Sequence, residues 1–363
     1  MKTKLIFLFV LAFVSCKQNS KGPNAKVKAI AKNNVDKIDK IDIHSHFRYD
    51  TDYLKSFMDN NNMKAVLVDV AQHNTDDSTK VNRSWDNYLA LSKQYPDIFL
   101  LCSSLIGIGI DDPKYTEKEI SRLKKEIRQG AKMVKVWKNF GMITKDASGK
   151  FIQIDDVRLQ PIWDFLSSEN IPVMAHIGEP LQAWTPLDPK NPHFSYYKNN
   201  PQYHAYTSPE VPSYETIIAA RDKWAQNNSN LKILGAHNGS MSHDVDMIAE
   251  RLDKFPNFNI ELAARFGDLV RQDSDKVKAF FEQYQNRIHF GTDFGNYDPP
   301  TGMSPEERKK EEQDLKTGYD QLHLYLSSTD TVEIRGQVNK GLGLSTEVLH
   351  KIYVTNTINF LEL

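Results

Sequence analysis

The sequence repeats one pattern eight times: a short apolar run rich in β-branched residues, then a longer stretch with helical spacing. The apolar runs span 38–46, 65–71, 99–106, 133–138, 172–176, 232–237, 259–264 and 287–293. Helical patterns lie between them, for example at 116–129, 156–169, 214–227, 243–255 and 273–285. Strands that alternate with helices predict a parallel sheet, and eight such units close most simply into a (β/α)8 barrel. An open doubly wound sheet is the alternative, but no glycine-rich phosphate-binding motif follows the first strand.

The repeats predict one α/β domain over residues 38–363, with long loops on one face. Residues 179–213 are rich in proline and aromatic side chains, and residues 296–316 are highly charged. Both segments follow predicted strands, so in a barrel both lie on the C-terminal face, where active sites form. Residues 345–360 are expected to close the chain as a helix.

The N-terminus carries features of export. Residues 1–16 (MKTKLIFLFVLAFVSC) hold two lysines and then an apolar run of about ten residues, too short for a bilayer span of about 20. The run ends at Cys16 and resembles a bacterial lipobox. We therefore expect residues 1–16 to be a lipoprotein signal peptide, Cys16 to be lipidated and residues 17–37 to be a flexible tether. A plain signal peptide with an incidental cysteine is the alternative. The lipoprotein hypothesis places the protein on a bacterial membrane, on the periplasmic side or at the cell surface.

The overall charge gives no reason to expect a polyanionic partner. The formal net charge is -1, from 46 basic and 47 acidic residues, so no global field favours nucleic acid. We expect a small-molecule substrate and contact with the membrane through the lipid anchor. A homo-oligomer is compatible with the sequence.

The first predicted strand contains the sharpest local motif, Ile41-Asp42-Ile43-His44-Ser45-His46. Side chains two residues apart on a strand point the same way, so His44 and His46 are expected to share a face, with Ile41, Ile43 and Ser45 on the other. Two neutral imidazoles on one face can chelate a Zn2+-like ion. The pattern alone also fits two surface histidines on a half-exposed strand.

Three further strands end in a residue of the same kind. The strand at 172–176 ends in His176, the next in His237, and the last in Asp293. A single histidine at a strand end is usually structural. Four strands that place ligand-type residues at the same rim of a barrel indicate a metal site.

In this order, the motifs resemble those of the amidohydrolase superfamily. The phrases LKILGAHNGS, KFPNFNIELAAR and RIHFGTDFG, and the closing IYVTNTINFLEL, are similar to the branch that contains aminocarboxymuconate-semialdehyde decarboxylase. The resemblance covers about residues 38–363. It is specific for the fold and the metal centre, and it says little about the substrate.

The resemblance implies a role for each rim residue. His44, His46, His176 and Asp293 would ligate one divalent ion, with Zn2+ expected, and such an ion lowers the pKa of its bound water toward ~7. His237 falls where the branch has a catalytic histidine, which would polarise the substrate carbonyl or orient the nucleophile. Asp293 would also accept a proton from the water. A structural role for His237 is the alternative.

Lys135 has three possible roles. Binuclear members of the superfamily carry a carboxylated lysine that bridges two ions, and Val134-Lys135-Val136 resembles that pattern, which would imply a second ion. Lys135 could instead bind substrate or pair with Asp293, or be structural. Lys138 is an alternative substrate contact.

Three loop residues are further candidates for substrate binding or for orienting the ligands. Glu179 lies three residues after His176 and is a candidate to orient it. Arg265 follows the seventh strand and could hold a substrate carboxylate. Trp184 could belong to a lid over the site or pack inside its own loop.

These residues predict a metal-dependent hydrolase that cleaves a carbon–oxygen or carbon–nitrogen bond next to a carbonyl, in a small polar molecule, by metal-activated water. The same ligands would also serve non-oxidative decarboxylation of an aromatic or enoic acid. A rival of another class is a metal-carrying binding lipoprotein without turnover. The complete ligand set together with His237 argues against this rival, because a binding module needs no centre that activates water.

Overall fold

A computed structural model describes residues 38–73 and 80–363 of the chain. The predicted signal peptide at 1–16, its Cys16 and the tether at 17–37 lie outside the described residues. Within the two described segments, no helix is both long and apolar enough to cross a membrane.

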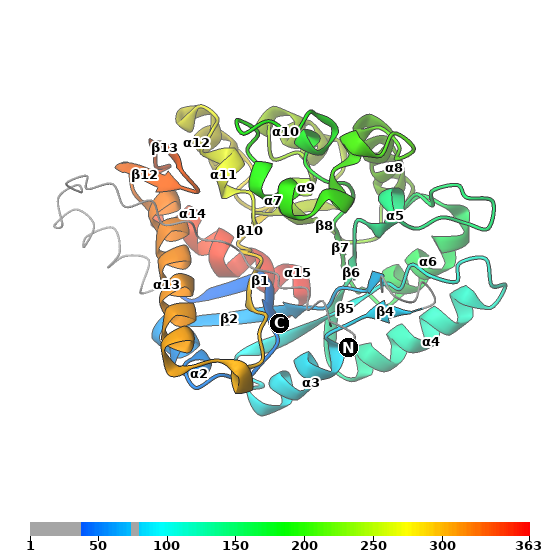
Figure 1. The fold of residues 1–363 in the computed structure, drawn as a ribbon, viewed down its shortest axis with the longest axis horizontal. Coiled ribbons are helices and arrows are strands. Elements are labelled where there is room, and N and C mark those ends of the chain that lie inside the picture. Colours follow the sequence, from blue (N-terminus) through cyan, green and yellow to red (C-terminus); the bar gives the residue numbers. More distant parts are fainter. Residues whose placement is uncertain (1–37, 74–79) are drawn as a thin grey trace, which may run out of the picture.

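The central element is a barrel of parallel strands (Figure 1). Its strands, within the described residues, are β1 (Lys40–Phe47), β2 (Met63–Val68), β5 (Phe99–Ser104), β6 (Ala131–Val136), β7 (Val173–Ala175), β8 (Ile233–Gly235), β9 (Phe258–Glu261), β10 (Ile288–His289) and β11 (Phe294–Asn296). They are ordered β10-β9-β8-β7-β6-β5-β2-β1-β11. The ring closes where Ile43 donates its backbone N–H to Phe290, and Asp293 donates to His44, at 3.0 and 2.8 Å. The predicted (β/α)8 barrel is therefore confirmed.

The first strand differs from the expected alternation. Pairing with β2 shifts register between Asp42 and Ser45, so β1 holds one extra residue there. A bulge of this kind changes which face the following side chains occupy. Ile41 and Ile43 pack with Met133, Met174 and Leu234 of other strands inside the barrel.

The prediction that Ile41 and Ile43 lie on the opposite face from the two histidines is therefore wrong. Asp42 takes the outward position and accepts hydrogen bonds from the Thr292 and Tyr319 hydroxyls at 2.5 and 2.6 Å. Because of the bulge, the side chains of β1 that face the barrel interior are apolar before His44 and polar from His44 to the C-terminal end of the strand.

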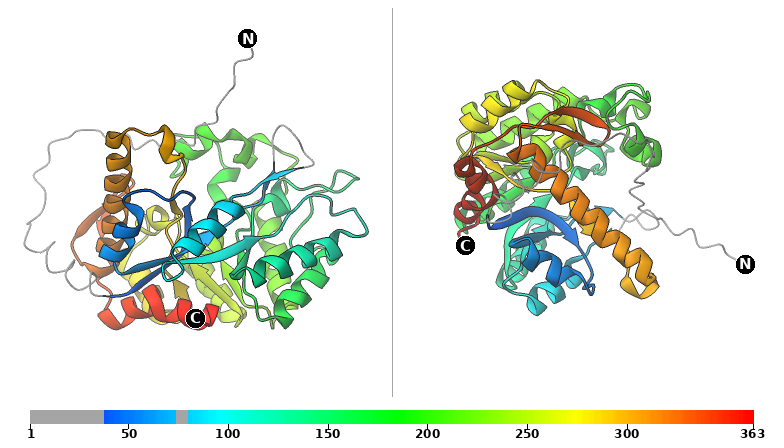
Figure 2. Two further views of the ribbon diagram at one scale, coloured as in Figure 1. Left: turned by 90° about the horizontal axis from the view of Figure 1, so that it is seen from below. Right: turned by 90° about the vertical axis from the view of Figure 1, so that its left-hand side faces the viewer.

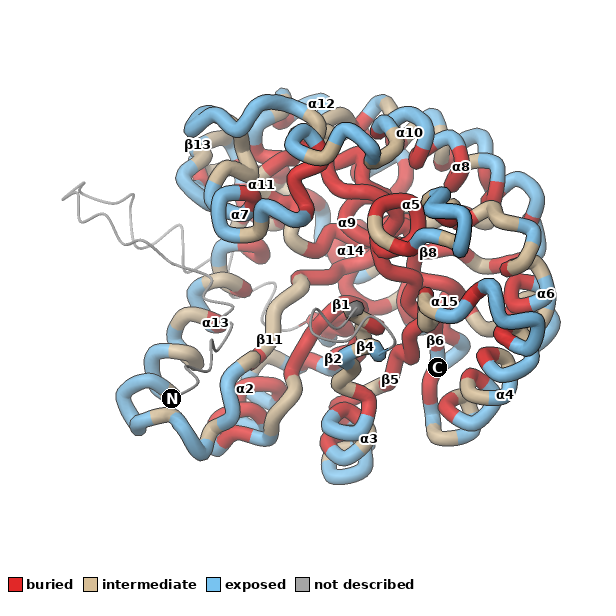
Figure 3. Tube along the Cα trace, turned by 45° about the vertical axis from the view of Figure 1, so that its right-hand side comes forward, coloured by how far each residue is buried: buried red, intermediate tan, exposed pale blue. Residues whose placement is uncertain are grey.

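Helices cover the outside of the barrel (Figures 1 and 2). They are α2 (Leu54–Asn60), α3 (Trp85–Gln94), α4 (Tyr115–Arg128), α6 (Gln160–Ser168), α8 (Tyr214–Asn227), α10 (Val245–Lys254) and α12 (Ser274–Gln283), with a short turn η1 (Val157–Leu159) before α6. The buried residues of α4 are spaced by four, four and three positions, which gives one face to the barrel and the other to solvent. Figure 3 shows this division for the whole fold: buried strands within, exposed helix faces outside.

The loops on the C-terminal face contain short elements. Residues 179–213 form η2 (Leu181–Trp184), α7 (Phe194–Asn199), η3 (Pro201–Tyr203) and η4 (Ala205–Thr207). Elsewhere lie β3 (Gln72–His73), β4 (Val81–Asn82), α5 (Asn139–Met142), α9 (Ala236–Gly239), α11 (Phe266–Leu269) and η5 (Pro300–Gly302).

The end of the chain returns along the barrel. The charged segment leads into α13 (Pro305–Ser327), which begins with a capping box between Ser304 and Glu307. A hairpin follows, β12 (Thr331–Ile334) and β13 (Gln337–Lys340), which the sequence patterns did not predict. The closing helix is α14 (Thr346–His350), a π-helical turn (Lys351–Thr355) and α15 (Asn356–Leu361).

Candidate metal centre

Three of the predicted ligands meet at the rim of the barrel. The Nε2 atoms of His44 and His46 lie 3.4 and 2.9 Å from the same oxygen, Oδ1 of Asp293. His44 and His46 come from β1, and Asp293 follows β10. Because β1 and this segment are neighbours in the closed barrel, two distant parts of the sequence deliver one cluster of donors.

The spacing of these atoms fits a metal ion. Zinc binds histidine nitrogen at about 2.0–2.1 Å in tetrahedral geometry, which places neighbouring ligand atoms about 3.3–3.4 Å apart. The candidate groups of His44, His46 and Asp293 all lie within 4.8 Å of one another. Two imidazoles and a carboxylate are also the donor types that Zn2+ accepts.

The fourth predicted ligand, His176, lies close to the cluster and has a buried ring nitrogen that is available to bind an ion. It lies outside the group of three, but its ring centroid is 4.2 Å from that of His237. Its Nε2 atom is buried and has no hydrogen-bond partner in the described part of the chain. Burial and the nearby ammonium groups of Lys135 and Lys138 lower the pKa of His176 well below its ordinary value, so the ring is neutral and able to donate a lone pair.

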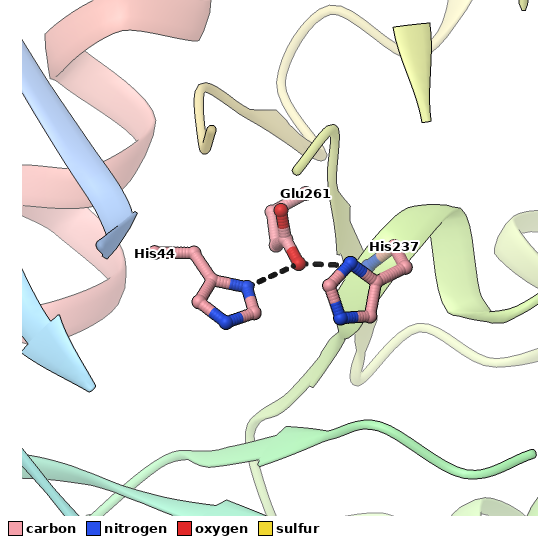
Figure 4. A group of neighbouring side chains, drawn as sticks. All are labelled: His44, His237 and Glu261. Carbon is pink, nitrogen blue, oxygen red and sulfur yellow. Dashed lines mark hydrogen bonds and ion pairs between the residues drawn. The ribbon is translucent and has the colours of Figure 1, made fainter. Parts of the chain in front are cut away.

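The structure adds one residue that the sequence reasoning missed, Glu261 at the end of β9. Its Oε1 atom is 2.9 Å from Nδ1 of His44 and accepts the backbone N–H of His237 at 2.7 Å (Figure 4). Glu261 is fully buried. The available sequence signal was an acidic residue inside the strand predicted at 259–264.

The contact between Glu261 and His44 fixes the proton on the imidazole. A carboxylate accepts, so Nδ1 of His44 carries the hydrogen and Nε2 presents its lone pair toward Asp293. Asp293 is ionised as well. Burial alone would raise its pKa, but a hydrogen bond from His46 and electrostatic interactions with His44, His46 and Lys135 hold the pKa well below the ordinary value.

His237 lies beside the cluster in an unusual backbone conformation. Its ring centroid is 5.0 Å from that of His44, and its Nδ1 is 2.9 Å from the carbonyl oxygen of Ala263. A carbonyl only accepts, so Nδ1 carries the hydrogen and Nε2 is an acceptor. Burial, and then the neighbouring His176, lower the pKa of His237 well below its ordinary value, which keeps the ring neutral.

Several rim residues have positive φ angles. His237, Asn238, Gly239 and Ser240 have φ of 58°, 57°, 60° and 62°, so the segment labelled α9 is a left-handed turn. Ala264 and Asp293 also have positive φ, at 58° and 65°. Non-glycine residues in this region cost on the order of 1–3 kcal/mol each and cluster at functional sites. Hydrogen bonds hold the turn in place, including Ser240 Oγ to the Gly178 carbonyl at 2.9 Å.

Lys135 points into the barrel next to the cluster. Its Nζ atom is 3.4 Å from Nε2 of His44 and 3.3 Å from Sδ of Met174. Burial lowers its pKa to about 8, against the opposing effect of the Glu261 and Asp293 carboxylates.

Lys138 and Glu179, two separate candidates in the sequence, form a buried ion pair with each other. Lys138 also donates to the Tyr196 hydroxyl at 2.9 Å and sits 3.6 Å above the ring of Tyr203. Burial lowers the pKa of Lys138, while Glu179 opposes that change. The pair connects the aromatic loop, residues 179–213, to the residues that follow β6. Glu179 thus pairs with Lys138, whereas the sequence suggested that it orients His176.

The two remaining candidates occupy different surroundings. Trp184 donates its indole N–H to the Pro212 carbonyl of its own loop at 3.0 Å and packs edge-on against Tyr214, the first residue of α8. Arg265 lies just after β9, is 9% exposed, and its Nε atom is buried with no hydrogen-bond partner among the described residues.

A cavity of about 290 Å³ opens beside the cluster. Its walls include His46, Arg48, Gln72, Arg83 and Tyr88. Arg83 is fixed by buried carboxylates, since its Nε donates to Asp69 at 2.6 Å. The cavity gives a small molecule access to the His46 side of the cluster.

A parallel barrel with histidines and a carboxylate at its C-terminal rim defines the class of metal-dependent barrel enzymes. Comparison with known protein families and solved structures identifies the family within this class. The family model described as amidohydrolase matches residues 41–363. The chain belongs to the amidohydrolase family, and it is a metal-dependent enzyme of that family. No curated protein sequence matches it.

Solved structures show the same fold at low identity. A 2,6-dihydroxybenzoate decarboxylase from Rhizobium superposes with a TM-score of 0.51 and 15% identity, over 90% of this chain and 99% of that chain. A protein described as an amidohydrolase from Staphylococcus aureus gives 0.50 and 14%, over 90% and 100%. A protein described as amidohydrolase II gives 0.50 and 16%, over 89% and 100%. These likenesses support the fold and carry no information on the substrate.

Proposed function

We propose that this protein hydrolyses a carbon–oxygen or carbon–nitrogen bond next to a carbonyl in a small polar molecule. The observation that carries the proposal is a contact of His237, whose Nδ1 lies 2.9 Å from the carbonyl oxygen of Ala263. Its Nδ1–H is held by Ala263, which leaves Nε2 as a neutral, buried acceptor beside the ligand cluster. A hydrolase needs such an acceptor for the proton of the attacking water.

His44, His46, His176 and Asp293 are the residues that would hold the ion. The donor set of three imidazoles and one carboxylate favours Zn2+. When bound, the ion supplies a Lewis acid and lowers the pKa of a water molecule toward ~7. We propose a single ion, because Lys135 contacts the thioether of Met174 and the ring of His44, surroundings that offer little to a carboxylated side chain.

The same contact supports one of two proposed roles for His237. A histidine that polarises a carbonyl must donate from the nitrogen that faces the substrate. The nitrogen that faces the cluster here is an acceptor, so His237 orients the water and takes its proton. Glu261 supports this role, since it holds the backbone N–H of His237 at 2.7 Å.

Decarboxylation is the second candidate, because the same ligands serve it and Arg265 is placed to hold a carboxylate. That reaction replaces a carboxylate by hydrogen and therefore needs a proton donor at the reacting carbon. A neutral His237 that accepts at Nε2 is in the opposite state, which favours hydrolysis. A binding protein without turnover is not supported, because the family consists of enzymes.

The test is a panel of esters, lactones, amides and aromatic acids, incubated with the zinc-reconstituted protein and analysed by mass spectrometry. We expect products that have gained one water. Products that have lost one carbon dioxide would overturn hydrolysis in favour of the second candidate. Incubation with a chelator is the control and is expected to abolish turnover.

A further inference from the structure

Two arginines from distant parts of the sequence meet beside the candidate centre. Arg265 follows β9, and Arg335 lies at the tip of the β12–β13 hairpin. Both donate an Nη1 hydrogen to the same carbonyl oxygen, that of Ala264, at 3.3 and 3.1 Å. Their guanidinium groups are therefore neighbours. The preceding carbonyl, that of Ala263, is the partner of His237, so the arginine pair and the proton acceptor are held by consecutive peptide units.

The backbone of Arg335 has an unfavourable conformation at the tip of the hairpin. Arg335 and Gly336 have φ of 51° and 75°, so both central residues of the two-residue turn are left-handed. Asparagine, aspartate and glycine are preferred at the first of these positions. An arginine there is disfavoured, and residues kept in such conformations mark candidate functional sites.

The hairpin is fixed on the barrel, so its tip is held in place. Asn339 donates to the Val270 carbonyl at 2.8 Å, and Ser274 Oγ donates to the Lys340 carbonyl at 2.6 Å. The aliphatic part of the Arg335 side chain lies over Gly267: a Cβ added to Gly267 would be 3.6 Å from Cδ of Arg335. Figure 1 shows the hairpin beside α11 and α12, next to the C-terminal rim.

The nearest negative charges act on Arg265 without a direct contact: the carboxylates of Asp268 and Glu179 raise the pKa of its guanidinium against the effect of burial. Across residues 38–73 and 80–363, no carboxylate forms an ion pair with either arginine. Arg265 is nine-tenths buried, and its Nε has no hydrogen-bond partner there. Adjacent guanidinium groups repel each other, and the burial of Arg265 makes the repulsion more costly, while Arg335 reaches it from the exposed tip of the hairpin. The arrangement is favourable when an anion lies between them.

We propose that Arg265 and Arg335 form an oxyanion-binding pair that holds a carboxylate or phosphate group of the substrate next to His237. This inference rests on the proposed function, because it treats the rim as the place of reaction. It adds the substrate class, an anionic small molecule, and a recognition residue on a hairpin outside the eight βα units. Burial, and then the charge of Arg265, lower the pKa of the Arg335 guanidinium. The Asp293 carboxylate opposes burial at both arginines, so both lie within electrostatic reach of the ligand cluster.

The test is binding of benzoate, phenyl phosphate and benzamide to the metal-loaded, full-length protein by titration calorimetry. The variant is Arg335→Asn, because asparagine tolerates the left-handed turn. Lys340→Asn removes a positive charge from the same hairpin and is the matched control. We expect the Arg335 variant to bind the preferred anion about 10- to 100-fold more weakly, as the loss of charged hydrogen bonds implies, with benzamide unchanged. The Lys340 variant is expected to match wild type.

The two anions distinguish the ligand chemistry: stronger benzoate binding assigns a carboxylate, and stronger phenyl phosphate binding a phosphate. Arg265→Lys keeps the charge and loses the fork, so it is expected to weaken the same anion. Unchanged anion binding by Arg335→Asn would overturn the proposal. Equal losses for the anion and benzamide would also overturn it, because a structural arginine affects both. The measurement needs no turnover, so failure of the hydrolase assay leaves it intact.

Discussion

Glu261 Oε1 lies 2.9 Å from Nδ1 of His44 and, at 2.7 Å, accepts the backbone N–H of His237. One buried carboxylate oxygen therefore orients a metal ligand and the proposed proton acceptor together. The other oxygen accepts the backbone N–H of Ala263, whose carbonyl fixes the ring of His237. A single buried side chain thus places both the ligand and the acceptor.

The first prediction concerns this carboxylate. Glu261→Gln keeps the shape but replaces one oxygen by an NH2 group, which cannot accept from His44 or from the backbone. We expect zinc affinity to fall about 10- to 100-fold, the usual effect of removing the partner of a ligating histidine. Competition with a chromophoric chelator measures it. Glu282→Gln, on the exposed face of α12, is the control, and zinc affinity equal to wild type in Glu261→Gln would contradict the assignment.

The second prediction concerns the ligands. His46→Ala, His176→Ala and Asp293→Ala each remove one donor of the proposed ion. We expect metal content well below one ion per chain and loss of turnover, both measured on protein purified in parallel with wild type. His350→Ala changes an exposed histidine far from the rim and is the control. A variant of Asp293 that keeps its full metal content would remove Asp293 from the ligand set.

The sequence was sufficient for the barrel and for the set of strand-end residues, because both follow from local periodicity. It was not sufficient for the β1 bulge, since a bulge depends on pairing with β2. It also missed Glu261, because a single glutamate in a predicted strand looks like many solvated ones until the neighbouring strands are known. The hairpin with Arg335 was missed for a similar reason: its strands are short, and its Arg-Gly turn departs from the usual Asn-Gly or Asp-Gly.

The third prediction concerns acid stability. Burial opposes ionisation of Asp268, but hydrogen bonds from His193 and Ser242 and the charge of Arg265 lower its pKa to about 2. Because the folded pKa is below the ordinary value of 3.8, Asp268 contributes stability at higher pH that is lost as pH falls from about 4 to 2. The contribution is roughly 2 kcal/mol. Urea unfolding at pH 5 and pH 2 measures it.

Asp268→Asn is expected to lose less free energy of unfolding between these pH values than wild type, by about that amount. The difference arises because the contact fastens His193, in the aromatic loop, to α11. Asp275→Asn, an exposed aspartate of α12, is the control. Equal pH dependence of wild type and Asp268→Asn would contradict the prediction.

The fourth prediction concerns the anchor, which rests on the sequence of residues 1–16 alone. We propose that the protein is exported and lipid-anchored at Cys16. Cys16→Ser is expected to release the protein from the membrane fraction or to stall its processing, as fractionation and mass spectrometry of the N-terminus would show. Wild-type protein that is found soluble, with a mature N-terminus elsewhere, would refute the anchor.

The last prediction separates metal binding from proton transfer at His237. His237→Asn is the informative change, because asparagine also tolerates a φ near 58° and leaves the left-handed turn in place. We expect metal content and thermal stability near wild type. Removal of a general base typically costs about 10²–10⁴-fold in rate. The expected fall in kcat therefore corresponds to about 3–5 kcal/mol of transition-state stabilisation.

Two results would contradict this role for His237. If the variant loses its metal, His237 is a ligand; a second ion and a carboxylated Lys135 would then have to be considered. If it keeps both metal and activity, His237 is structural and another rim residue accepts the proton. Asn238→Ser, in the same turn, is the control for backbone disturbance: its side-chain amide is buried without a partner among the described residues. A loss of activity in His237→Asn that Asn238→Ser does not share assigns the proton acceptor to the imidazole.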